Sequence, residues 1–508
     1  MRGVTKTFGR IVANNKVDME IHTGEILSLL GENGSGKTTL MNMLSGIYYP
    51  DEGQIYVNGE PVTIRSPKDA FDLGIGMIHQ HFKLVDVLTA TENILLGLNE
   101  KGALNLKAAA EKIRTICDKY GFVVDPNKKI YDMSVSEKQT VEIVKVLYRG
   151  ANILILDEPT AVLTPQETRK LFNVMRNMKE DGKSIIIITH KLHEVMEISD
   201  RVAVLRKGEY VGDVPTCETN PQNLTDMMVG RAVTLNIDRP DPVNVTKRLE
   251  VRNLTVNNVY GLRAVDHVSF TANAGEILGI AGISGCGQKE LLEAIAGLQA
   301  TEEGSSVQYY PDETNKSVEL IGMNPLDIKK AGVAFSFVPE DRLGMGLVGS
   351  MGMTGNMMLR SYRNGKSFFT DRKAPKKLAE SVLEQLEVVT PGINTPVRRL
   401  SGGNVQKVLV GREIAAAPRV LMTAYAVRGL DINTSYTIYN LLTEQKMKGV
   451  AVIYVGEDLD VLLELCDRIL VLCGGKVNGI LDARTTTKEE VGLLMTNLQE
   501  ENEKEVTE

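Results

Sequence analysis

Cysteine, long apolar runs and excess positive charge are all scarce in this sequence, and each shortage excludes a class of protein. The 508 residues include five cysteines, an odd number without any Cys-x-x-Cys pair, so neither a disulfide framework nor a zinc site is predicted. No apolar run approaches the ~20 residues that span a bilayer, and the N-terminus lacks the apolar core of a signal peptide. The net charge of −7 argues against a general nucleic-acid-binding surface. We therefore expect an intracellular protein without direct membrane insertion and without a nucleic-acid partner.

What the sequence does contain is the composition of a globular protein with several domains. Hydrophobic residues make up 43% of the chain and charged residues 24%, as in typical soluble domains. A chain of 508 residues is too long for a single hydrophobic core. Residues 498–508 are acidic and nearly free of apolar side chains, so we expect a disordered tail.

A glycine-rich stretch at residues 31–39 carries the clearest chemical signal. It follows the apolar run Ile26–Leu30, which is typical of a buried strand, and precedes Leu40–Leu44, which has helical spacing. Glycines let successive backbone N–H groups surround a phosphate, and the following helix N-terminus adds partial positive charge. Lys37 would reach the outer phosphates, and the hydroxyl of Thr38 would bind Mg²⁺. The predicted nucleotide-binding residues of this P-loop are Gly31, Glu32, Asn33, Gly34, Ser35, Gly36, Lys37, Thr38 and Thr39.

The chain contains two copies of the same sequence pattern. Residues 24–27 recur 251 residues later at 275–278, where they again precede a glycine-rich turn. Three later landmarks recur at a constant offset of 267 residues, which aligns the second copy with the first and places insertions between about 309 and 376. These landmarks begin at Ser134, Ile155 and Thr189 in the first copy and at Ser401, Met422 and Gly456 in the second.

Each copy has the length of one large α/β domain. Short β-rich runs such as 152–156 and 184–188 alternate with amphipathic helical stretches such as 165–179. This alternation is typical of a mainly parallel sheet that binds a nucleotide at its C-terminal edge. The predicted organisation is a first domain at 1–230, a linker at 231–248, a second domain at 249–497 and the tail at 498–508.

Two carboxylates follow a predicted buried strand of the first copy. The run 152–156 ends in Asp157 and Glu158, so both side chains should lie at the sheet edge near Lys37. Asp157 would hold Mg²⁺ through its water shell, and Glu158 would act on the attacking water in phosphoryl transfer. The alternative is an acidic pair that only caps the helix after Pro159.

Other side chains at strand ends extend the candidate site. His190 ends a buried run, where a lone histidine is often structural, but the shared sheet edge favours a catalytic role. Gln80 follows the short strand predicted at 75–78, and its amide could ligate Mg²⁺ or water. His79 and His81 flank Gln80, but no further metal ligand is adjacent, so we expect them to contact a partner. Phe8 could stack on an adenine or simply pack internally.

Together these motifs resemble those of ABC transporter ATPases. The resemblance implies two tandem P-loop NTPase domains, each with a mainly parallel sheet core, a small antiparallel β part and a helical subdomain. It also implies ATP and Mg²⁺ as ligands. Residues 31–38 resemble the Walker A motif, Gln80 the Q-loop and Asp157-Glu158 the Walker B motif. His190 resembles the switch histidine, and Leu400–Asn404 resemble the signature.

The fusion of two such domains is similar to the ATP-binding subunits of importers for simple sugars and nucleosides. Residues 76–85 and 338–342 most resemble the nucleoside and basic-membrane-protein branch of these importers. The predicted function is therefore an ATP-hydrolysing, energy-coupling subunit, with nucleosides as the predicted substrate and simple sugars as the alternative. The resemblance places the protein peripherally at the cytoplasmic face of the cell membrane.

The resemblance also implies partner proteins. Transmembrane permease subunits should contact the chain near Gln80–Leu95, and an extracellular substrate-binding protein would act through the permease. The segment 82–95 could equally be an ordinary solvated loop. The rival interpretation is a soluble tandem ATPase that acts on ribosomes or DNA, but such proteins usually keep both Walker motifs and carry a long charged linker or zinc modules.

The second copy has lost the residues that this chemistry needs. Gln288 stands at the position of Lys37, and a neutral amide cannot supply the charge-assisted phosphate contact of a lysine. We therefore expect no hydrolysis at the second glycine-rich turn, while nucleotide binding there stays open. The other replacements are Lys289 for Thr38, Ala424 for Asp157, Tyr425 for Glu158, Glu340 for Gln80 and Glu457 for His190.

The losses in the two copies are complementary. The first signature segment, Ser134–Glu137, lacks glycine, whereas the second keeps Gly402 and Gly403, which let a helix N-terminus approach the γ-phosphate. The family resemblance implies a head-to-tail sandwich, with each nucleotide between one P-loop and the other signature. We therefore predict one competent composite site, which takes the P-loop, Asp157 and Glu158 from the first copy and Ser401, Gly402, Gly403 and Asp431 from the second.

Overall fold

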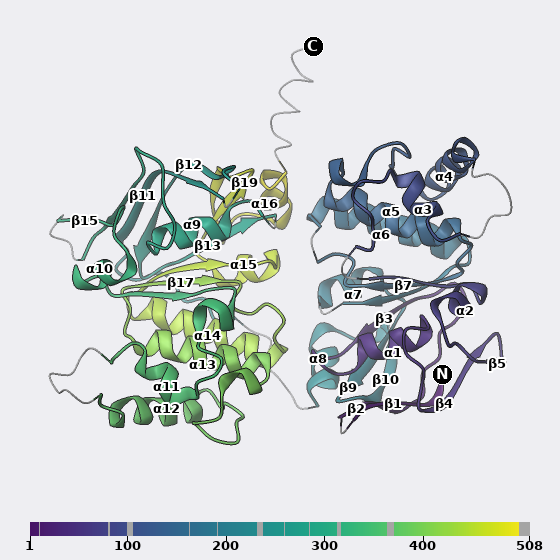
Figure 1. The fold of residues 1–508 in the computed structure, drawn as a ribbon, viewed down its shortest axis with the longest axis horizontal. Coiled ribbons are helices and arrows are strands. Elements are labelled where there is room, and N and C mark those ends of the chain that lie inside the picture. The colour runs from purple at the N-terminus through teal and green to yellow at the C-terminus, as the bar shows by residue number, and fades with distance from the viewer. Residues whose placement is uncertain are drawn as a thin grey trace, which may run out of the picture. The chain divides into compact units, whose positions relative to one another are not determined.

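The computed structural model divides the chain into two compact units, Met1–Leu235 and Asn236–Glu508 (Figure 1). Each unit contains one six-stranded sheet, one four-stranded sheet and a group of helices. The predicted tail and residues 231–236 of the predicted linker lie outside the described residues. The described residues are 1–9, 11–79, 82–98, 105–161, 163–189, 191–230, 237–258, 260–283, 285–311, 316–362 and 370–496.

A six-stranded sheet forms the centre of the first unit. Its strands are β3 (Ile26–Leu30), β6 (Ile75–Ile78), β7 (Ile153–Asp157), β8 (Ser184–Ile188), β9 (Arg201–Arg206) and β10 (Glu209–Pro215). The order is β10-β9-β3-β8-β7-β6, and all neighbours are parallel except β10 and β9. Because both faces of the sheet are covered, β3 and β8 are buried along their whole length. The segments that follow the parallel strands therefore meet at one edge.

A second, antiparallel sheet covers one face of this centre. It has the order β2-β1-β4-β5 and consists of β1 (Arg2–Phe8), β2 (Ile11–Val17), β4 (Glu52–Val57) and β5 (Glu60–Val62). Helix α1 (Lys37–Leu44) lies between the two sheets (Figure 1). Its buried face, with Leu40, Met41 and Met43, belongs to one apolar core with Leu27 and Leu29 of β3.

Helices cover the opposite face of the six-stranded sheet (Figure 1). Leu154 and Ile185, on β7 and β8, share a core with Ile143 and Met175 of two long helices. Those helices are amphipathic, so burying their apolar stripe holds them against the sheet. The helices and turns of this unit are α2 (Pro67–Asp72), α3 (Ala90–Leu95), α4 (Leu106–Tyr120), η1 (Ile130–Asp132), α5 (Val135–Tyr148), α6 (Pro165–Glu180), α7 (Leu192–Ile198), η2 (Thr216–Glu218) and α8 (Pro221–Val229).

The second unit repeats this architecture. Its strands are β11 (Thr246–Asn257), β12 (Arg263–Ala274), β13 (Ile277–Gly282), β14 (Ser306–Tyr309), β15 (Val318–Glu319), β16 (Phe335–Val338), β17 (Val420–Ala424), β18 (Ala451–Val455), β19 (Arg468–Cys473) and β20 (Lys476–Asp482). They form sheets of order β16-β17-β18-β13-β19-β20 and β12-β11-β14-β15. The helices and turns are α9 (Gln288–Ile295), α10 (Pro325–Lys330), η3 (Arg342–Gly346), α11 (Met353–Met358), α12 (Lys373–Gln385), η4 (Val397–Arg399), α13 (Gly402–Ala415), α14 (Ile432–Met447), α15 (Leu459–Leu465) and α16 (Lys488–Leu494).

The predicted fold class and repeat are confirmed. Helix α9 begins 251 residues after α1, and α14 begins 267 residues after α6, as the sequence offsets require. The predicted strand at 184–188 has the observed bounds of β8, and the strand predicted at 152–156 is β7, shifted by one residue.

The segment at 237–241 belongs to the second unit and contacts its helix α14. The carbonyl of Pro240 accepts a 2.6 Å hydrogen bond from Lys446 Nζ, which is also ion-paired with Asp467 at 2.7 Å. The first unit has the matching pair, Lys179 and Asp200, at 2.6 Å. The side chains of the first pair are 36% and 39% exposed, but those of the second only 1% and 6%. The two copies therefore keep one ion pair in very different environments.

Candidate active site

The side chain of Lys37 closes the P-loop of the first unit. Its ammonium donates hydrogen bonds to the carbonyl oxygens of Gly31 at 2.7 Å and Glu32 at 3.0 Å. The side chain is buried, and this burial lowers the pKa of Lys37, while Glu158 and Asp157 oppose the shift. A cation in this position can exchange its backbone acceptors for phosphate oxygens, which form stronger charge-assisted hydrogen bonds.

Two glycines of the P-loop lie so close to neighbouring atoms that no side chain would fit at either position. Gly36 has a φ of +98°, and a Cβ there would collide with the carbonyl oxygen of Ala13. A Cβ on Gly31 would collide with the hydroxyl of Ser35. Among the described residues this buried hydroxyl has no hydrogen-bond partner, and α1 has neither a side-chain cap nor an acidic residue in its first turn. An unpaired hydroxyl beside an uncapped helix N-terminus fits a phosphate group.

The remaining P-loop positions are accessible to a ligand. Thr38 is exposed at the start of α1, so its hydroxyl is available to a metal ion. Asn33 and Gly34 are exposed, and Glu32 and Thr39 are half-buried. Phe8, at the end of β1, has a 43% exposed ring that packs edge-on against Tyr48 at 5.2 Å. The ring therefore has internal packing and retains surface on which an adenine could stack.

The carboxylates of Asp157 and Glu158 follow β7 at the sheet edge. Burial and the neighbouring Glu158 raise the pKa of Asp157 to about 6, while Lys37 acts in the opposite direction. Glu158 has a φ of +49°, and its backbone N–H donates a 2.8 Å hydrogen bond to the carbonyl of Ile188 on β8. A left-handed glutamate is strained, and such strain is concentrated at functional sites. The buried carboxylate of Asp157 and the exposed hydroxyl of Thr38 are oxygen donors of the kind that a hard divalent cation such as Mg²⁺ prefers.

Two predicted catalytic residues, Gln80 and His190, lie outside the described residues, as does His81. They follow β6 and β8 in the sequence, and both strands end at the edge that carries Asp157. His79 is described and half-buried, and burial lowers its pKa. Over the described part of the chain, no group of three or more His, Cys, Asp or Glu side chains is placed to bind a metal ion.

The matching turn of the second unit contains no phosphate-binding lysine. Gln288 is buried, and its amide donates a 3.1 Å hydrogen bond to the carbonyl of Ile283. Gly287 keeps the left-handed backbone, with a φ of +93°. The first turn of α9 contains Glu290, an acidic residue that α1 lacks. The second turn has therefore kept the left-handed glycine of a P-loop and lost the buried ammonium group at the position of Lys37.

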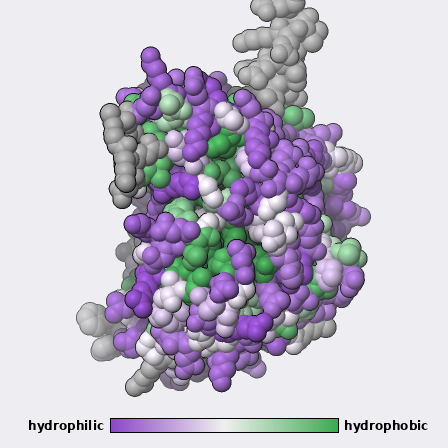
Figure 2. All heavy atoms as spheres, turned by 90° about the vertical axis from the view of Figure 1, so that its right-hand side faces the viewer, coloured by the Kyte–Doolittle hydropathy of each residue, from purple (hydrophilic) through white to green (hydrophobic). Residues whose placement is uncertain are grey.

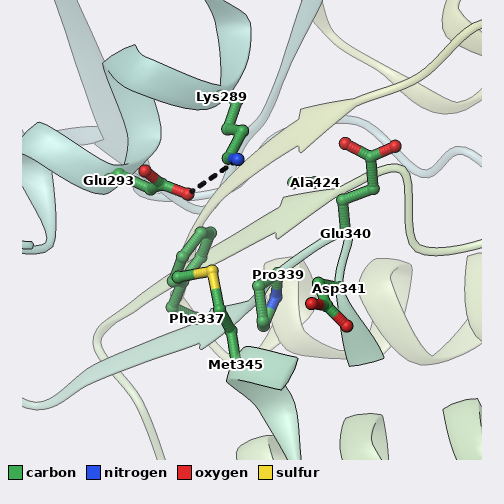
Figure 3. A pocket seen from close by; sticks show the side chains of 8 residues that line it. All are labelled: Lys289, Glu293, Phe337, Pro339, Glu340, Asp341, Met345 and Ala424. Carbon is green, nitrogen blue, oxygen red and sulfur yellow. Dashed lines mark ion pairs between the residues drawn. The ribbon is translucent and has the colours of Figure 1, made fainter. Parts of the chain in front are cut away.

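The strand end of the second unit has a different chemistry on the same backbone. Tyr425 follows β17 with a φ of +50°, and its N–H donates a 3.0 Å hydrogen bond to Val455, just as Glu158 bonds Ile188. Burial, together with Glu457 and Glu340, raises the pKa of Tyr425 far above its usual range. A pocket of about 280 Å³ lies beside this strand end (Figure 3). Its lining residues are Lys289, Glu293, Phe337, Pro339, Glu340, Asp341, Met345 and Ala424.

The N-termini of the two signature helices differ in charge. In the first unit Ser134 caps α5, and the carboxylate of Glu137 folds back to accept a 2.7 Å hydrogen bond from the Ser134 N–H. In the second unit Ser401 caps α13, the position of Glu137 is taken by Asn404, and the first turn contains no acidic residue. An anion near α5 would meet the Glu137 carboxylate, which is ion-paired with Lys128 at 2.8 Å. The first turn of α13 contains no carboxylate of its own, although Asp431 borders it beside Gly403.

The segment after Gln80 is anchored at several points. Its backbone N–H at Lys83 donates a 2.6 Å hydrogen bond to the buried Glu142, and the Val85 N–H donates to Asn93 Oδ1 at 2.8 Å. Between these anchors and α4 the chain exposes Val85, Val87 and Leu96. Figure 2, which views the side of the first unit, shows apolar side chains gathered within a mainly hydrophilic surface. The segment is thus anchored and includes α3, which does not favour the alternative of an ordinary solvated loop.

Some residues at this site were not predicted from the sequence. Asn14 donates a 3.3 Å hydrogen bond to the carbonyl of Gly36, and Glu142 and Asn93 hold the segment after Gln80. Asn93 sits within a readable capping pattern, Thr89 followed by Glu92, but nothing in the sequence indicates that its amide reaches back to Val85.

Comparison with known proteins identifies both halves of the chain. Residues 14–161 and 265–423 match the family described as "ABC transporter". The nucleoside import ATP-binding protein NupA of Lactococcus lactis subsp. cremoris is 43% identical over 501 residues, which cover 97% of each chain. The ribose import ATP-binding protein RbsA 1 of Rubrobacter xylanophilus is 39% identical over 502 residues, covering 98% of this chain and 97% of that protein.

A solved structure supports the fold over nearly the whole chain. The archaeal ribosome recycling factor aABCE1, in complex with the ribosomal stalk protein aP1, matches with a TM-score of 0.60 and covers 95% of this chain and 90% of that one. Its sequence identity of 16% supports a common fold and nothing more. None of the helices in the described ranges has both the length and the apolar character needed to span a membrane.

Proposed function

Because this chain belongs to the ABC transporter family, as a tandem ATP-binding protein of the nucleoside and ribose importers, we propose that it powers nucleoside import through one competent ATP site. It is an ATPase, it binds ATP through its ABC domains, and it works with permease subunits. In the proposed site, the P-loop of the first unit binds the triphosphate and the Ser401–Gly403 segment of the second unit completes it. We propose residues 1–230 as the hydrolytic domain and residues 249–497 as the supporting domain, with a linker at 231–248.

Each group of the first unit has a distinct role in the proposed reaction. Lys37 balances charge on the outer phosphates, and the backbone of the P-loop orients them. Glu158 orients and deprotonates the attacking water, with Gln80 and His190 positioning that water and the γ-phosphate. Asp157, Thr38 and Gln80 would hold Mg²⁺. The metal would supply electrostatic stabilisation of the charge that develops on the phosphoryl oxygens.

The observation that carries the asymmetry of this proposal is the charge at the signature helices. The carboxylate of Glu137 already occupies the N-terminus of α5, where it accepts from the Ser134 N–H and is ion-paired with Lys128 at 2.8 Å, so a γ-phosphate would have to displace it to reach that helix end. At α13, Asn404 is neutral, and Ser401 and the two glycines leave the helix N-terminus accessible. The intact signature therefore belongs to the unit that lacks the catalytic carboxylates. Only the P-loop and carboxylates of the first unit, combined with the signature of the second, make a complete site in this proposal.

The reaction is tested in the purified importer complex by measuring ATP turnover. Glu158→Gln should abolish hydrolysis while retaining ATP binding, because only the water-activating base is removed. Ser401→Ala should raise the KM for ATP, since it removes the cap of the helix that faces the γ-phosphate. The matched control is Ser134→Ala in the first unit. If the control raised the KM and Ser401→Ala did not, the assignment of signatures would be wrong.

The proposed substrate class is a nucleoside, with a simple sugar as the alternative. The nucleoside relative is 43% identical and the ribose relative 39%, so the difference in identity favours the nucleoside only modestly. Selectivity resides in the permease and in an extracellular binding protein, because this chain provides energy and not the transport path. Uptake of labelled guanosine, uridine and ribose by cells with and without this chain separates the alternatives.

The permease is proposed to dock on Gln80–Leu95 at the cytoplasmic face of the membrane. This segment is anchored by Glu142 and Asn93 and exposes Val85 and Val87, which gives an apolar contact on a fixed scaffold. The alternative class, a tandem ATPase that acts on ribosomes or DNA, rests on a likeness of fold alone. Co-purification with membrane proteins supports the importer, whereas co-sedimentation with ribosomes supports the alternative.

A further inference from the structure

One arginine of the second unit contacts all three positions that match the γ-phosphate end of the first site. Arg428 Nη1 forms a 2.6 Å ion pair with Glu340, and Nε lies 3.2 Å from Glu457. The guanidinium also lies 6.0 Å from the ring centre of Tyr425. In the alignment of the two copies, Glu340, Tyr425 and Glu457 correspond to Gln80, Glu158 and His190. One half-exposed guanidinium therefore joins the residues of the second unit that match the nucleotide-facing groups of the proposed first site.

The same arginine is connected to the signature segment of its own unit. Its backbone carbonyl accepts a hydrogen bond from Arg342 Nη2. The other terminal nitrogen of Arg342 lies 3.3 Å from the position that a Cβ on Gly402 would occupy. Three residues further along, Asp431 caps α14, and its carboxylate lies 3.3 Å from the corresponding position on Gly403. The turn at 428–431 thus borders Gly403 through Asp431 and is linked to Gly402 through Arg342.

The pocket beside this cluster is unsuited to a nucleoside triphosphate. Its walls contain three carboxylates, from Glu293, Glu340 and Asp341, and a single lysine, Lys289. The ammonium of Lys289 points toward Glu293, 3.9 Å away, and Glu340 and Asp341 lie on the opposite side (Figure 3). Glu340 is paired with Arg428 and Glu293 with Lys289, so the two nearest cations are already engaged by carboxylates and Asp341 adds a further negative charge, which disfavours a polyphosphate.

We propose that Arg428 is a positioning residue that replaces the nucleotide in the second unit and holds the Ser401–Gly403 segment in place. In the first unit, phosphate and metal would link the strand ends to one another. In the second unit, the ion pairs of Arg428 provide that link, and the Arg342 contact carries it to the signature. The degenerate site of the second unit then helps to hold the signature segment that completes the competent ATP site. The role of the signature in this inference rests on the proposed composite site.

The test compares Arg428→Gln, Arg428→Lys and a matched control in the complete importer. Arg263→Gln is the control, because Arg263 is 52% exposed and paired with two carboxylates in the same unit, while Arg428 is 51% exposed. Arg428→Gln should speed hydrogen exchange at 338–346 and 401–404 about fivefold with or without Mg-ATP, the loss expected for a modest ion-pair network. It should also raise the KM for ATP about threefold to tenfold with a smaller change in kcat. Arg428→Lys should restore part of both effects.

Two outcomes would overturn the inference. One is that Arg428→Gln changes exchange at 401–404 no more than Arg263→Gln does. The other is that Mg-ATP slows exchange at 283–289 in the unmodified protein, because the second turn would then bind nucleotide itself. A failure of the composite site looks different: Ser401→Ala would leave the KM for ATP unchanged, while the exchange effects of Arg428→Gln would persist. The two ideas can therefore fail separately.

Discussion

The ammonium group of Lys37 donates a 2.7 Å hydrogen bond to the carbonyl oxygen of Gly31, so the backbone of the first P-loop positions its own cation. Lys37 also donates to Glu32 at 3.0 Å, and in the second unit the neutral amide of Gln288 makes the matching contact with Ile283. The two loops therefore share left-handed glycines at matching positions and differ by one unit of charge at the position of Lys37. This pair of loops allows the contribution of that charge to be measured within one chain.

Replacing the two loop residues should have very unequal effects. Lys37→Ala should lower ATP turnover at least about a hundredfold, because a buried charge-assisted contact worth about 1.5–3 kcal/mol is lost and the phosphates are misplaced. Gln288→Ala, the matched control, should change turnover less than about twofold, because no phosphate is expected at the second turn. Steady-state hydrolysis by the purified importer is the measurement. Equal losses in the two variants would contradict the assignment of one hydrolytic unit.

The carboxyl group of Asp157 should make stability depend on pH. Burial and Glu158 raise its pKa from 3.8 to about 6, so the folded state favours the protonated carboxyl group. The protonated group stabilises the folded state fully below pH 3.8, and this stabilisation is lost as the pH rises through about 6. At neutral pH the buried carboxylate therefore destabilises the ligand-free first unit. Asp157→Asn should raise the free energy of unfolding by about 1–3 kcal/mol at pH 7.5 and have little effect near pH 4. Urea unfolding at both pH values checks this, and a loss of stability at pH 7.5 would disprove it.

The two copies of the lysine–aspartate pair should differ in their contribution to stability. Lys446→Met leaves the buried Asp467 without its closest cation, so the second unit should lose about 3 kcal/mol. Lys179→Met removes the exposed counterpart beside Asp200 and should cost at most about 1 kcal/mol. Denaturant unfolding followed by hydrogen exchange assigns each loss to its unit. Similar small losses would mean that the contact with Pro240 does not shield the second pair from water.

The sequence predicted most of the fold because the central strands are long apolar runs and the repeat aligns them twice. Lys37, Asp157 and Glu158 were assigned to one site since each follows a strand of the same parallel sheet. The left-handed backbone at Glu158 could not be predicted, because local preference reserves it for glycine or asparagine. The ion pairs of Arg428 were also missed, since pattern reasoning places residues at a sheet edge without fixing where a long side chain points.

A buried asparagine fixes the segment after the Q-loop in both units, and its loss should be measurable in each. Asn93 accepts from the Val85 N–H at 2.8 Å and donates to the Val85 and Thr89 carbonyls at 3.1 and 3.0 Å. In the second unit, Asn356 bonds Val348 in the same way, at 2.8 and 3.2 Å.

Because both asparagines are buried, their replacement by alanine leaves backbone groups unpaired. Asn93→Ala and Asn356→Ala should each cost about 1–3 kcal/mol in their own unit. Asn105→Ala is the control, because Asn105 caps α4 from an exposed position and its loss should cost about 1 kcal/mol or less. Denaturant unfolding measures these costs, and hydrogen exchange at 82–88 should rise only in Asn93→Ala. If exchange at 82–88 stayed slow in that variant, Glu142 alone would hold the proposed permease contact, and Asn93 would contribute stability without shaping the docking surface.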